Sequence, residues 1–348
     1  MCFLFLLLKS KTNLMIKLKT IALIMISSFG IYAQQKFIGS LIVESPAFHN
    51  LIASDAKIEV LASGFNWSEG PVWSKEGQFL LFSDVPENII YKYKAGEGLS
   101  VFLKPSGYTG KLPYSQEPGS NGLIINNEGE LVACEHGDRR VTRMPLNQGG
   151  GKYPVADNWQ GKRFNSPNDL VQSISGTYYF TDPPYGLPDR ENATTREIDI
   201  FGVYKVDKFG IAEVVITDLS RPNGVALSPD EKTLYVAQSD PEAAYIMSYS
   251  IQSDGTLKDG KILFDATPMV KAGLSGLPDG LKTDKKGNIF TTGPGGVLVL
   301  TSEGDLLGRI STGQNTSNLN WGDDGSVLYI TADMYLCKIQ TKTIGKGF

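Results

Sequence analysis

The chain has 348 residues and a formal net charge of −4, with 20% charged and 41% hydrophobic residues. This composition is ordinary for a soluble globular protein, and the 38 glycines and 18 prolines suit many tight turns. There is no basic tract and no heptad pattern, so nucleic acid is not an expected partner.

The N-terminus is predicted to be a secretory signal peptide. Basic residues precede the apolar run 21–26, and a small-residue cleavage pattern ends at Ala33. The alternative is an uncleaved membrane anchor, but the run is too short to span a membrane comfortably. An earlier apolar run suggests that translation starts at Met15. We therefore assign residues 1–33 to the signal peptide and expect an exported protein, periplasmic or secreted, without membrane contact after cleavage.

Removal of this segment takes away four lysines and no acidic residue, which changes the formal charge from −4 to −8. The mature chain keeps two cysteines, Cys134 and Cys337, both within apolar strand-like runs. We interpret them as buried free thiols, with a disulfide as the alternative in an oxidising compartment.

The mature chain is predicted to be all-β, with a six-bladed β-propeller over residues 58–348 and a central metal site. A residue with a side-chain oxygen recurs six times, each time followed by hydrophobic residues, a turn and a β-rich run. These opening residues lie 38 to 56 positions apart, near the period of about 40–50 residues that marks a propeller blade. They are Glu69, Asn121, Asn168, Asn223, Asp279 and Ser317.

The predicted elements follow in chain order. A leader, residues 34–57, either lies across the propeller or closes its last blade. Blade one is expected to comprise the opening run at Glu69 and short strands at 58–61, 78–84, 88–93 and 99–103. The later blades begin at the other opening residues and end near residues 144, 206, 249, 300 and 339.

Two polar segments interrupt this regular order. Residues 104–120 form a loop rich in Pro, Gly and Tyr that could line the site, and residues 183–199 are an insertion in blade three. In five repeats a glycine stands eight residues after the opening residue, whereas the fourth repeat has Glu231 there, inside a turn. These positions are expected to be the turns that end the innermost strands.

If each opening residue starts the innermost strand of its blade, all six side chains surround one axis. Two are carboxylates, three are amides and one is a hydroxyl, and oxygen ligands of these kinds suit a hard divalent cation. The absence of histidine and cysteine argues against a soft-metal site. The alternative is that Asn-Gly and Asp-Gly are simply turn-favoured pairs. Their recurrence at matching points of the repeats favours the cation site.

Five motifs stand in a fixed order within roughly residues 55–340. They are Glu69-Gly-Pro-Val-Trp, Ser166-Pro-Asn-Asp169, Thr181-Asp-Pro-Pro-Tyr-Gly186, Arg221-Pro-Asn-Gly224 and Pro278-Asp-Gly280. Together they resemble the SMP-30/gluconolactonase/LRE-like family. The resemblance implies one catalytic divalent metal, held by Glu69, Asn168, Asn223 and Asp279. Ca²⁺ is the expected ion, with Mg²⁺, Mn²⁺ or Zn²⁺ as alternatives. Asn121 and Ser317 would then face the tunnel without binding the metal.

The activity that the resemblance implies is hydrolysis of a small sugar lactone such as gluconolactone. A metal would polarise the lactone carbonyl and stabilise the oxyanion that forms when water attacks. Glu69 and Asp279 are the candidate catalytic residues, and Asp279 is the candidate general base. Asn121, His136 and Tyr185 are the candidate substrate-binding residues.

Other polar residues have plainer interpretations. His136 is either a loop histidine satisfied by neighbouring backbone or a substrate-binding or proton-transfer residue. Tyr185 is expected in the pocket wall, and Arg139 and Arg140 are expected at the surface or at a blade edge. There is no Gly-x-Ser-x-Gly elbow and no P-loop motif, which argues against a serine hydrolase and a nucleotidase.

Two other functions remain open at this point. One is hydrolysis of a different ester or a phosphotriester, because the same oxygen ligands could polarise a phosphoryl oxygen. The other is a non-catalytic propeller that binds a ligand or partner and holds Ca²⁺ for structure alone. A cavity rich in hydrogen-bonding side chains would favour the sugar lactone over a phosphotriester. No oligomeric state is inferred.

Overall fold

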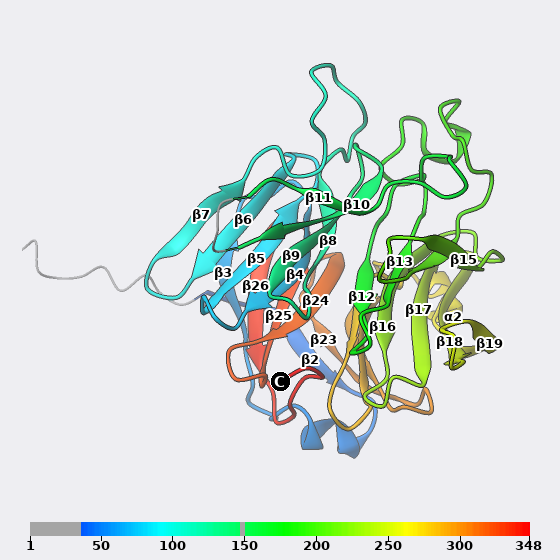
Figure 1. The fold of residues 1–348 in the computed structure, drawn as a ribbon. Helices are drawn as coiled ribbons and strands as arrows, with labels where there is room; N and C mark the ends of the chain where they lie inside the picture. Colours follow the sequence, from blue (N-terminus) through cyan, green and yellow to red (C-terminus); the bar gives the residue numbers. More distant parts are fainter. Residues whose placement is uncertain (1–35, 147–149) are drawn as a thin grey trace, which may run out of the picture. The chain divides into compact units, whose positions relative to one another are not determined.

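A computed structural model describes residues 36–146 and 150–348, so the predicted signal peptide lies outside the described residues. The described part contains 26 strands in six antiparallel sheets (Figure 1). One strand from each sheet contacts the corresponding strands of the two neighbouring sheets, and these contacts close into a ring. The prediction of an all-β, six-bladed propeller is therefore confirmed.

The first four blades each consist of four strands that follow one another along the chain. Blade one contains β4 (Ser68–Ser74), β5 (Phe79–Asp84), β6 (Ile89–Lys94) and β7 (Gly98–Leu103). Blade two contains β8 (Ser120–Ile125), β9 (Glu130–Glu135), β10 (Arg140–Pro145) and β11 (Tyr153–Ala156). Blade three contains β12 (Leu170–Gln172), β13 (Tyr178–Thr181), β14 (Val203–Val206) and β15 (Ala212–Ile216). Blade four contains β16 (Pro222–Leu227), β17 (Thr233–Asp240), β18 (Ala243–Ile251) and β19 (Leu257–Asp265).

The last two blades each include strands from the N-terminal part of the chain. Blade five contains β20 (Leu281–Thr283), β21 (Ile289–Gly293), β22 (Gly296–Leu300) and β23 (Leu306–Ser311), with β2 (Ser40–Val43) outside them. Blade six contains β24 (Thr316–Gly322), β25 (Val327–Ala332), β26 (Tyr335–Gln340), β3 (Ile58–Ser63) and β1 (Lys36–Ile38). The described helices are short: η1 (Pro46–Asn50), η2 (Arg190–Asn192) and α2 (Thr267–Lys271).

The assignment of residues 58–61 to blade one is wrong. Strand β3 pairs with β26 of blade six, with Ser63 opposite Tyr335 and Glu59 opposite Lys338. The C-terminal part of the chain supplies only three strands to this blade, so β26 would otherwise be an unpaired edge. The N-terminal strand covers that edge and closes the ring.

The segment before β3 is packed onto the same blades. Leu41 of β2 lies opposite Ile310 of β23, and Phe48 in η1 is fully buried against the core of blades five and six. These contacts give the leader a structural role in the propeller.

Hydrophobic clusters lie between neighbouring blades. Phe290 of blade five, for example, meets Trp321 of blade six edge to face, with ring centroids 4.9 Å apart. Cys134 in β9 and Cys337 in β26 are both buried, as predicted, and Cys134 is a free thiol. Among the described helices, none has the length and apolar character needed to cross a membrane.

The turn after each innermost strand explains the glycines at the eighth position. Gly129, Gly176, Gly287 and Gly325 have φ values between 78° and 92°, a left-handed conformation that glycine adopts without strain. Glu231 takes the same conformation, with φ of 56°, in the fourth repeat. Five of the six repeats thus share this conformation at the eighth position, whereas in the first repeat Gln78, one residue after Gly77, takes it with φ of 51°.

Candidate functional site

The opening residues lie at one end of the innermost strands, where the backbones of neighbouring blades are hydrogen bonded. Gly122 donates its N–H to the carbonyl of Asn168 at 2.7 Å, and Gly280 donates to that of Ser317 at 2.9 Å. A Cβ on Gly224 would lie 2.1 Å from the carbonyl oxygen of Asp279. The glycine after the opening residue therefore permits the close approach that gathers these side chains around the axis.

Five of the six opening residues line one cavity of about 580 Å³. Glu69 and Asp279 provide carboxylates, and Asn121, Asn168 and Asn223 provide amides. All three amide side chains and Glu69 are at most 5% exposed. Five different blades thus contribute five oxygen-bearing groups to one cavity, four of them buried and Asp279 half-buried.

The two carboxylates are in an unfavourable environment without a counter-charge. Burial raises the pKa of Glu69 to about 8, and nearby Asp169 adds to the effect. Burial and repulsion from Glu69 hold the pKa of Asp279 well above its ordinary value. A cation between these carboxylates would relieve both effects.

The amide oxygens also indicate that the cavity suits a cation. The side-chain oxygens of Asn121, Asn168 and Asn223 are buried and have no hydrogen-bond partner in the described protein. Orphaned buried acceptors are rare in proteins and call for a partner such as an ion. Three neutral oxygens and two carboxylates are a donor set that fits a hard divalent cation.

The described residues offer no alternative cluster of three or more His, Cys, Asp or Glu side chains for a metal. A metal in this cavity therefore depends on amide oxygens as well as on Glu69 and Asp279. The side chains of these four residues are chemically suited to hold a metal. That Glu69, Asn168, Asn223 and Asp279 are its ligands stays a prediction.

Hydrogen bonds fix the orientation of two amides. Asn223 donates its Nδ2 to the hydroxyl of Ser239 at 3.0 Å, and Asn168 Nδ2 lies 3.4 Å from His136 Nε2. In both residues the nitrogen is thus occupied, which leaves Oδ1 on the other side of the amide.

His136 does not line the cavity but stands behind Asn168. Its ring is fully buried, and its Nδ1 lies 3.1 Å from the carbonyl oxygen of Glu117. Since a carbonyl only accepts, Nδ1 carries the proton and Nε2 accepts from Asn168. Burial lowers the pKa of His136 to about 4, which keeps the ring neutral. Sequence reasoning had left open a role in substrate binding, which this position does not support.

The sixth opening residue, Ser317, is turned away. Its hydroxyl donates to the backbone carbonyl of Ser68 and lies 3.0 Å from the Thr331 hydroxyl. The next residue, Asn318, instead donates to Glu69 Oε2 at 3.1 Å, and Gly70 N donates to the same oxygen at 2.9 Å. Blade six therefore holds Glu69 in place through Asn318. The repeat pattern did not reveal this role, because Asn318 stands one position after the opening residue of its blade.

Tyr185 lies in the cavity wall, as predicted, and seven other polar residues there were missed. They are Glu117 on the 104–119 loop, Arg190 on the 183–199 insertion, Arg221 and Ser239 on blade four, Ser275 before β20, and Asn315 and Thr316 at the start of blade six. Arg190 and Glu117 form an ion pair at 3.2 Å. Glu117 and Arg190 come together because two loops fold toward each other. Residues on such loops do not recur with a period in the sequence, so the repeat pattern does not predict them.

The expectation that Arg139 lies at the surface is wrong. Arg139 is 2% exposed, and its guanidinium donates to the carbonyl oxygens of Phe164 at 2.5 Å and Thr195 at 3.0 Å. It ties together three segments that sequence alone does not bring near one another. Arg140 is half-buried at the start of β10, an inner strand of blade two, and pairs with Glu135 at 2.7 Å.

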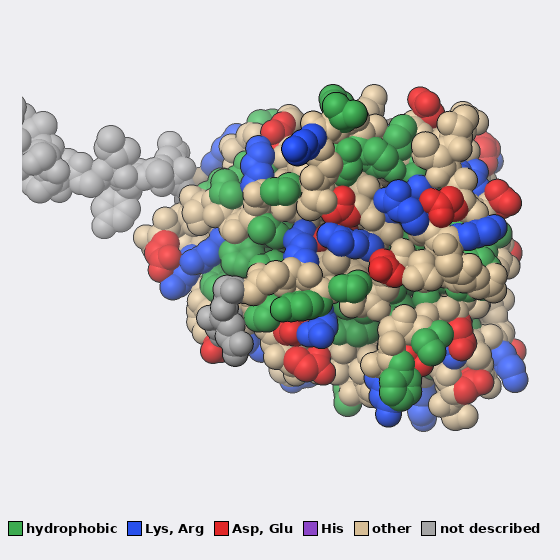
Figure 2. Space-filling view, turned by 45° about the horizontal axis from the view of Figure 1, so that its top comes forward, with side chains coloured by type: hydrophobic (Ala, Val, Ile, Leu, Met, Phe, Trp, Pro, Cys, Tyr) green, Lys and Arg blue, Asp and Glu red, His purple; other side chains and the backbone are tan. Residues whose placement is uncertain are grey.

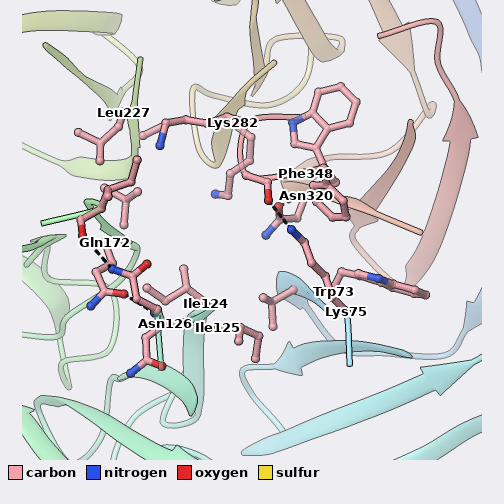
Figure 3. Close-up of a pocket in the computed structure, with 18 of the residues that line it drawn as sticks. Trp73, Lys75, Ile124, Ile125, Asn126, Gln172, Leu227, Lys282, Asn320 and Phe348 are labelled. Carbon is pink, nitrogen blue, oxygen red and sulfur yellow. Dashed lines mark hydrogen bonds between the residues drawn. The ribbon is translucent and has the colours of Figure 1, made fainter. Parts of the chain in front are cut away.

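The opposite ends of the innermost strands surround a second cavity of about 700 Å³ (Figure 3). Its charged groups are largely occupied: Lys346 pairs with Glu231 at 2.8 Å, and Lys75 lies over the ring of Phe348. Lys282 lies 3.8 Å from Asp169. The amide oxygens of Asn126, Gln172 and Asn320 in this cavity accept backbone N–H groups, whereas the amide oxygens at the other end have no partner in the described protein. We therefore assign the candidate site to the other end.

Comparisons with known proteins identify the family of the chain. The model of the SMP-30/Gluconolactonase/LRE-like region matches residues 67–333. A gluconolactonase from Zymomonas mobilis is 42% identical over 314 residues, 88% of each chain. The lactonase drp35 of Staphylococcus aureus is 27% identical and covers 74% of each chain.

A solved structure extends the likeness to the fold. The gluconolactonase of Xanthomonas campestris superposes with a TM-score of 0.77 and 28% identity, over 90% of this chain and 99% of that one. The family match spans most of the propeller and includes every opening residue. The chain therefore belongs to the SMP-30/gluconolactonase/LRE-like family.

Proposed function

We propose that the protein is a hydrolase that opens the ester ring of a small sugar lactone. The observation that carries the proposal is the buried ring of two carboxylates and three unpartnered amide oxygens, in a chain that is 42% identical to a gluconolactonase. In the reaction, water adds to the lactone carbonyl carbon and the ring C–O bond breaks. The ring oxygen takes a proton, and the product is an open-chain aldonate.

The proposal includes one divalent metal held by Glu69, Asn168, Asn223 and Asp279. When bound, it would supply Lewis-acid polarisation of the lactone carbonyl. Ca²⁺ is the proposed ion because all the ligands are oxygens and three of the five oxygen-bearing residues are neutral. Asp279 is the proposed general base for the attacking water, because its carboxylate lines the cavity beside the proposed metal.

The lining favours a sugar over a phosphotriester. Hydrogen-bonding side chains from Asn121, Tyr185, Ser239 and Glu117 surround the carboxylates. Each could accept from or donate to a sugar hydroxyl, whereas a phosphotriester has no hydroxyl to satisfy them. Of these side chains, Glu117 is the carboxylic acid: burial raises its pKa, and the positive charge of Arg190 acts in the opposite direction.

We also propose that the protein is exported and that residues 1–33 are removed. The apolar run, the basic residues before it and the small residues at its end support this proposal.

The decisive experiment is acid release from gluconolactone and xylonolactone by residues 34–348, corrected for spontaneous hydrolysis. The protein is stripped with a chelator and then supplied with Ca²⁺, Mg²⁺, Mn²⁺ or Zn²⁺. We expect turnover only after a metal is returned, with Ca²⁺ effective. Asp279→Ala should lower kcat/KM by about 10³-fold or more, whereas Glu128→Ala, far from the cavity, should match wild type. A folded protein that binds metal without turning over either lactone would instead support a binding scaffold or another substrate.

A further inference from the structure

A third cavity, of about 560 Å³, lies between the 104–119 loop and the 183–199 insertion. These segments join β7 to β8 and β13 to β14, and both rise above the strands at the top of Figure 1. Tyr114, Ser115 and Gln116 line the cavity from the loop, and Pro188 and Asp189 line it from the insertion. No residue of the proposed metal site takes part.

This third cavity adjoins the candidate active site. Tyr185 and Arg190 line both cavities. Cavities of about 300–1,000 Å³ hold drug-sized ligands, so the 580 Å³ site already exceeds the needs of one sugar ring. A molecule bound near Asp279 can therefore extend past Tyr185 into the third cavity.

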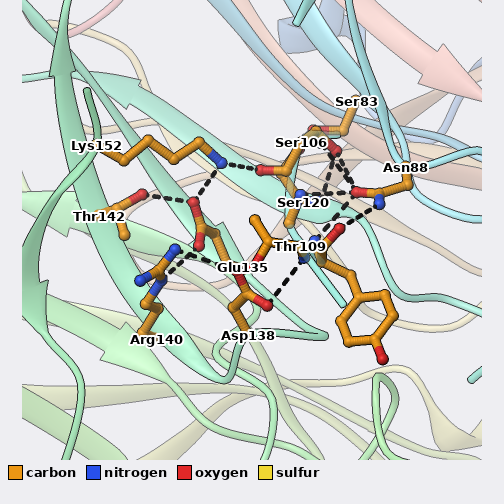
Figure 4. Close-up of polar contacts among 12 residues, drawn as sticks. Ser83, Asn88, Ser106, Thr109, Ser120, Glu135, Asp138, Arg140, Thr142 and Lys152 are labelled. Atoms are coloured by element: carbon orange, nitrogen blue, oxygen red, sulfur yellow. Dashed lines mark hydrogen bonds and ion pairs between the residues drawn. The ribbon is translucent and has the colours of Figure 1, made fainter. Parts of the chain in front are cut away.

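The walls of the third cavity are held in place before any ligand binds. At the root of the loop, Asn88 Oδ1 accepts from the backbone N–H groups of Ser106 at 2.9 Å and Gly107 at 2.8 Å. Asp138 accepts from both the backbone and the hydroxyl of Thr109, at 3.0 and 2.8 Å (Figure 4). Such preorganisation lowers the entropic cost of binding.

The opposite wall is fixed as well. Gly186 N donates to the Ser166 hydroxyl at 3.0 Å, and Arg221 pairs with Glu191 at 2.8 Å. The ion pair between Arg190 and Glu117 joins the insertion to the loop.

The lining has the chemistry of a sugar subsite. Tyr114 and Pro188 present flat apolar faces, while Gln116, Asp189 and Arg190 present planar hydrogen-bonding groups. The hydroxyl oxygens of Tyr114 and Ser115 are buried and lack a partner in the described protein. A ligand with many hydroxyl groups can satisfy such groups, because a hydroxyl both donates and accepts.

Charge narrows the class of ligand. Arg190 is paired with Glu117 and Glu191 with Arg221, which leaves Asp189 as the one unbalanced charge of the lining. A phosphate or carboxylate in this cavity would meet net negative charge. We propose that the third cavity binds a second, uncharged sugar unit, so that the substrates include lactones of disaccharide aldonic acids. This inference rests on the proposed lactonase activity.

The test compares kcat/KM for maltobionolactone, cellobionolactone, gluconolactone and 6-phosphogluconolactone. Wild type should hydrolyse at least one disaccharide lactone as efficiently as gluconolactone, and 6-phosphogluconolactone poorly. Tyr114→Ala and Gln116→Ala should each lower kcat/KM for that disaccharide lactone by about tenfold while leaving gluconolactone within about twofold. Gln116 is exposed, so its replacement leaves the core intact. Leu112→Ala is the control, since Leu112 is on the same loop, 77% exposed and outside the lining.

The outcomes separate this inference from the proposed function. Turnover of gluconolactone without turnover of either disaccharide lactone would overturn the subsite and leave the lactonase intact. The subsite would also be overturned if Tyr114→Ala and Gln116→Ala each lowered kcat/KM equally for gluconolactone and for the disaccharide lactone. If no lactone is hydrolysed, calorimetric binding of maltobionate decides the subsite alone: binding that Gln116→Ala weakens supports it, and no binding overturns it.

Discussion

At the scale of single residues, the orientation of two amides decides what the cavity can bind. The nitrogen atoms of Asn168 and Asn223 are bound to His136 and Ser239, which leaves their buried oxygens without a partner in the described protein. A reversed amide would present two N–H donors there and repel a cation. Groups that do not touch a ligand can thus control its affinity.

We expect His136→Phe to weaken Ca²⁺ binding about 10- to 100-fold, because phenylalanine cannot accept from Asn168 Nδ2. Isothermal titration calorimetry on the folded protein measures this loss. His136→Gln should recover part of the affinity, since an amide can accept from Asn168 and donate to the carbonyl of Glu117.

A double-mutant cycle separates orientation from general damage. In Asn168→Asp both terminal atoms are oxygens, so the side chain no longer depends on which way it is turned. We expect His136→Phe to weaken Ca²⁺ binding far less in that background than in wild type. Equal losses in the two backgrounds would contradict the orienting role of His136.

At the scale of elements, neighbouring innermost strands approach so closely at some glycines that a residue with a Cβ atom would not fit there. A Cβ at Gly70 would lie 2.1 Å from the carbonyl oxygen of Asn121, and one at Gly224 equally close to that of Asp279. These contacts are with backbone, which cannot move without opening the ring. The glycines after the opening residues therefore determine how tightly the blades pack at the axis.

Gly224→Ala should lower the free energy of unfolding by about 3 kcal/mol and reduce activity, because the blades must separate near Asp279. Gly151→Ala is the matched control, since nothing lies within 4 Å of a Cβ built there. Chemical denaturation of both variants measures the difference. A stability close to wild type for Gly224→Ala would show that the axis can relax.

A buried ion cluster supports the 104–119 loop. Glu135 in β9 is fully buried and accepts from Arg140 and from Thr142, each at 2.7 Å. Lys152 bridges Glu135 and the backbone carbonyl of Ser106 at the root of the loop (Figure 4). The cluster thus connects blade two to the segment that carries Glu117.

Glu135→Gln should cost about 3 kcal/mol of unfolding free energy, because it leaves the largely buried Lys152 without its carboxylate. The more exposed ion pair between Arg143 and Glu130 is the comparison: Arg143→Met should cost about 1 kcal/mol or less. Thermal denaturation ranks the two variants. Equal costs would mean that the Glu135 cluster contributes no more than a surface pair.

At the scale of the whole propeller, stability depends on joining the two ends of the chain. Strand β3 from the N-terminal part completes blade six, and β2 extends blade five. A propeller distributes its core among the contacts between neighbouring blades, so one incomplete blade weakens both of its neighbours. Figure 2 shows charged side chains of both signs interspersed over the visible face.

A chain that begins at residue 64 lacks β3 and should lose cooperative unfolding or aggregate, because β26 becomes an open edge. A chain that begins at residue 34 keeps β1, β2 and β3 and should unfold cooperatively. Calorimetry and size-exclusion chromatography distinguish the two. A monomeric, cooperative chain from residue 64 would contradict the closing role of β3.

The sequence by itself determined the number of blades, the position of the innermost strands and the five carboxylate and amide groups of the cavity. These features repeat along the chain, and a repeated pattern is readable because each blade meets the same local requirements. The side chains of Glu69, Asn121, Asn168, Asn223 and Asp279 were located in this way, and the structure places them in one cavity.

Features that are found in one blade or loop and do not recur in the other repeats were decided only by the tertiary structure. Glu117 and Arg190 form an ion pair because two unrelated loops fold toward each other, and the carbonyl oxygens of Phe164 and Thr195 come from distant segments to bind the buried Arg139. Ring closure by β3 and the place of His136 behind Asn168 also depend on contacts between distant segments. Long-range contacts of this kind leave no period in the sequence, which is why local patterns do not reveal them.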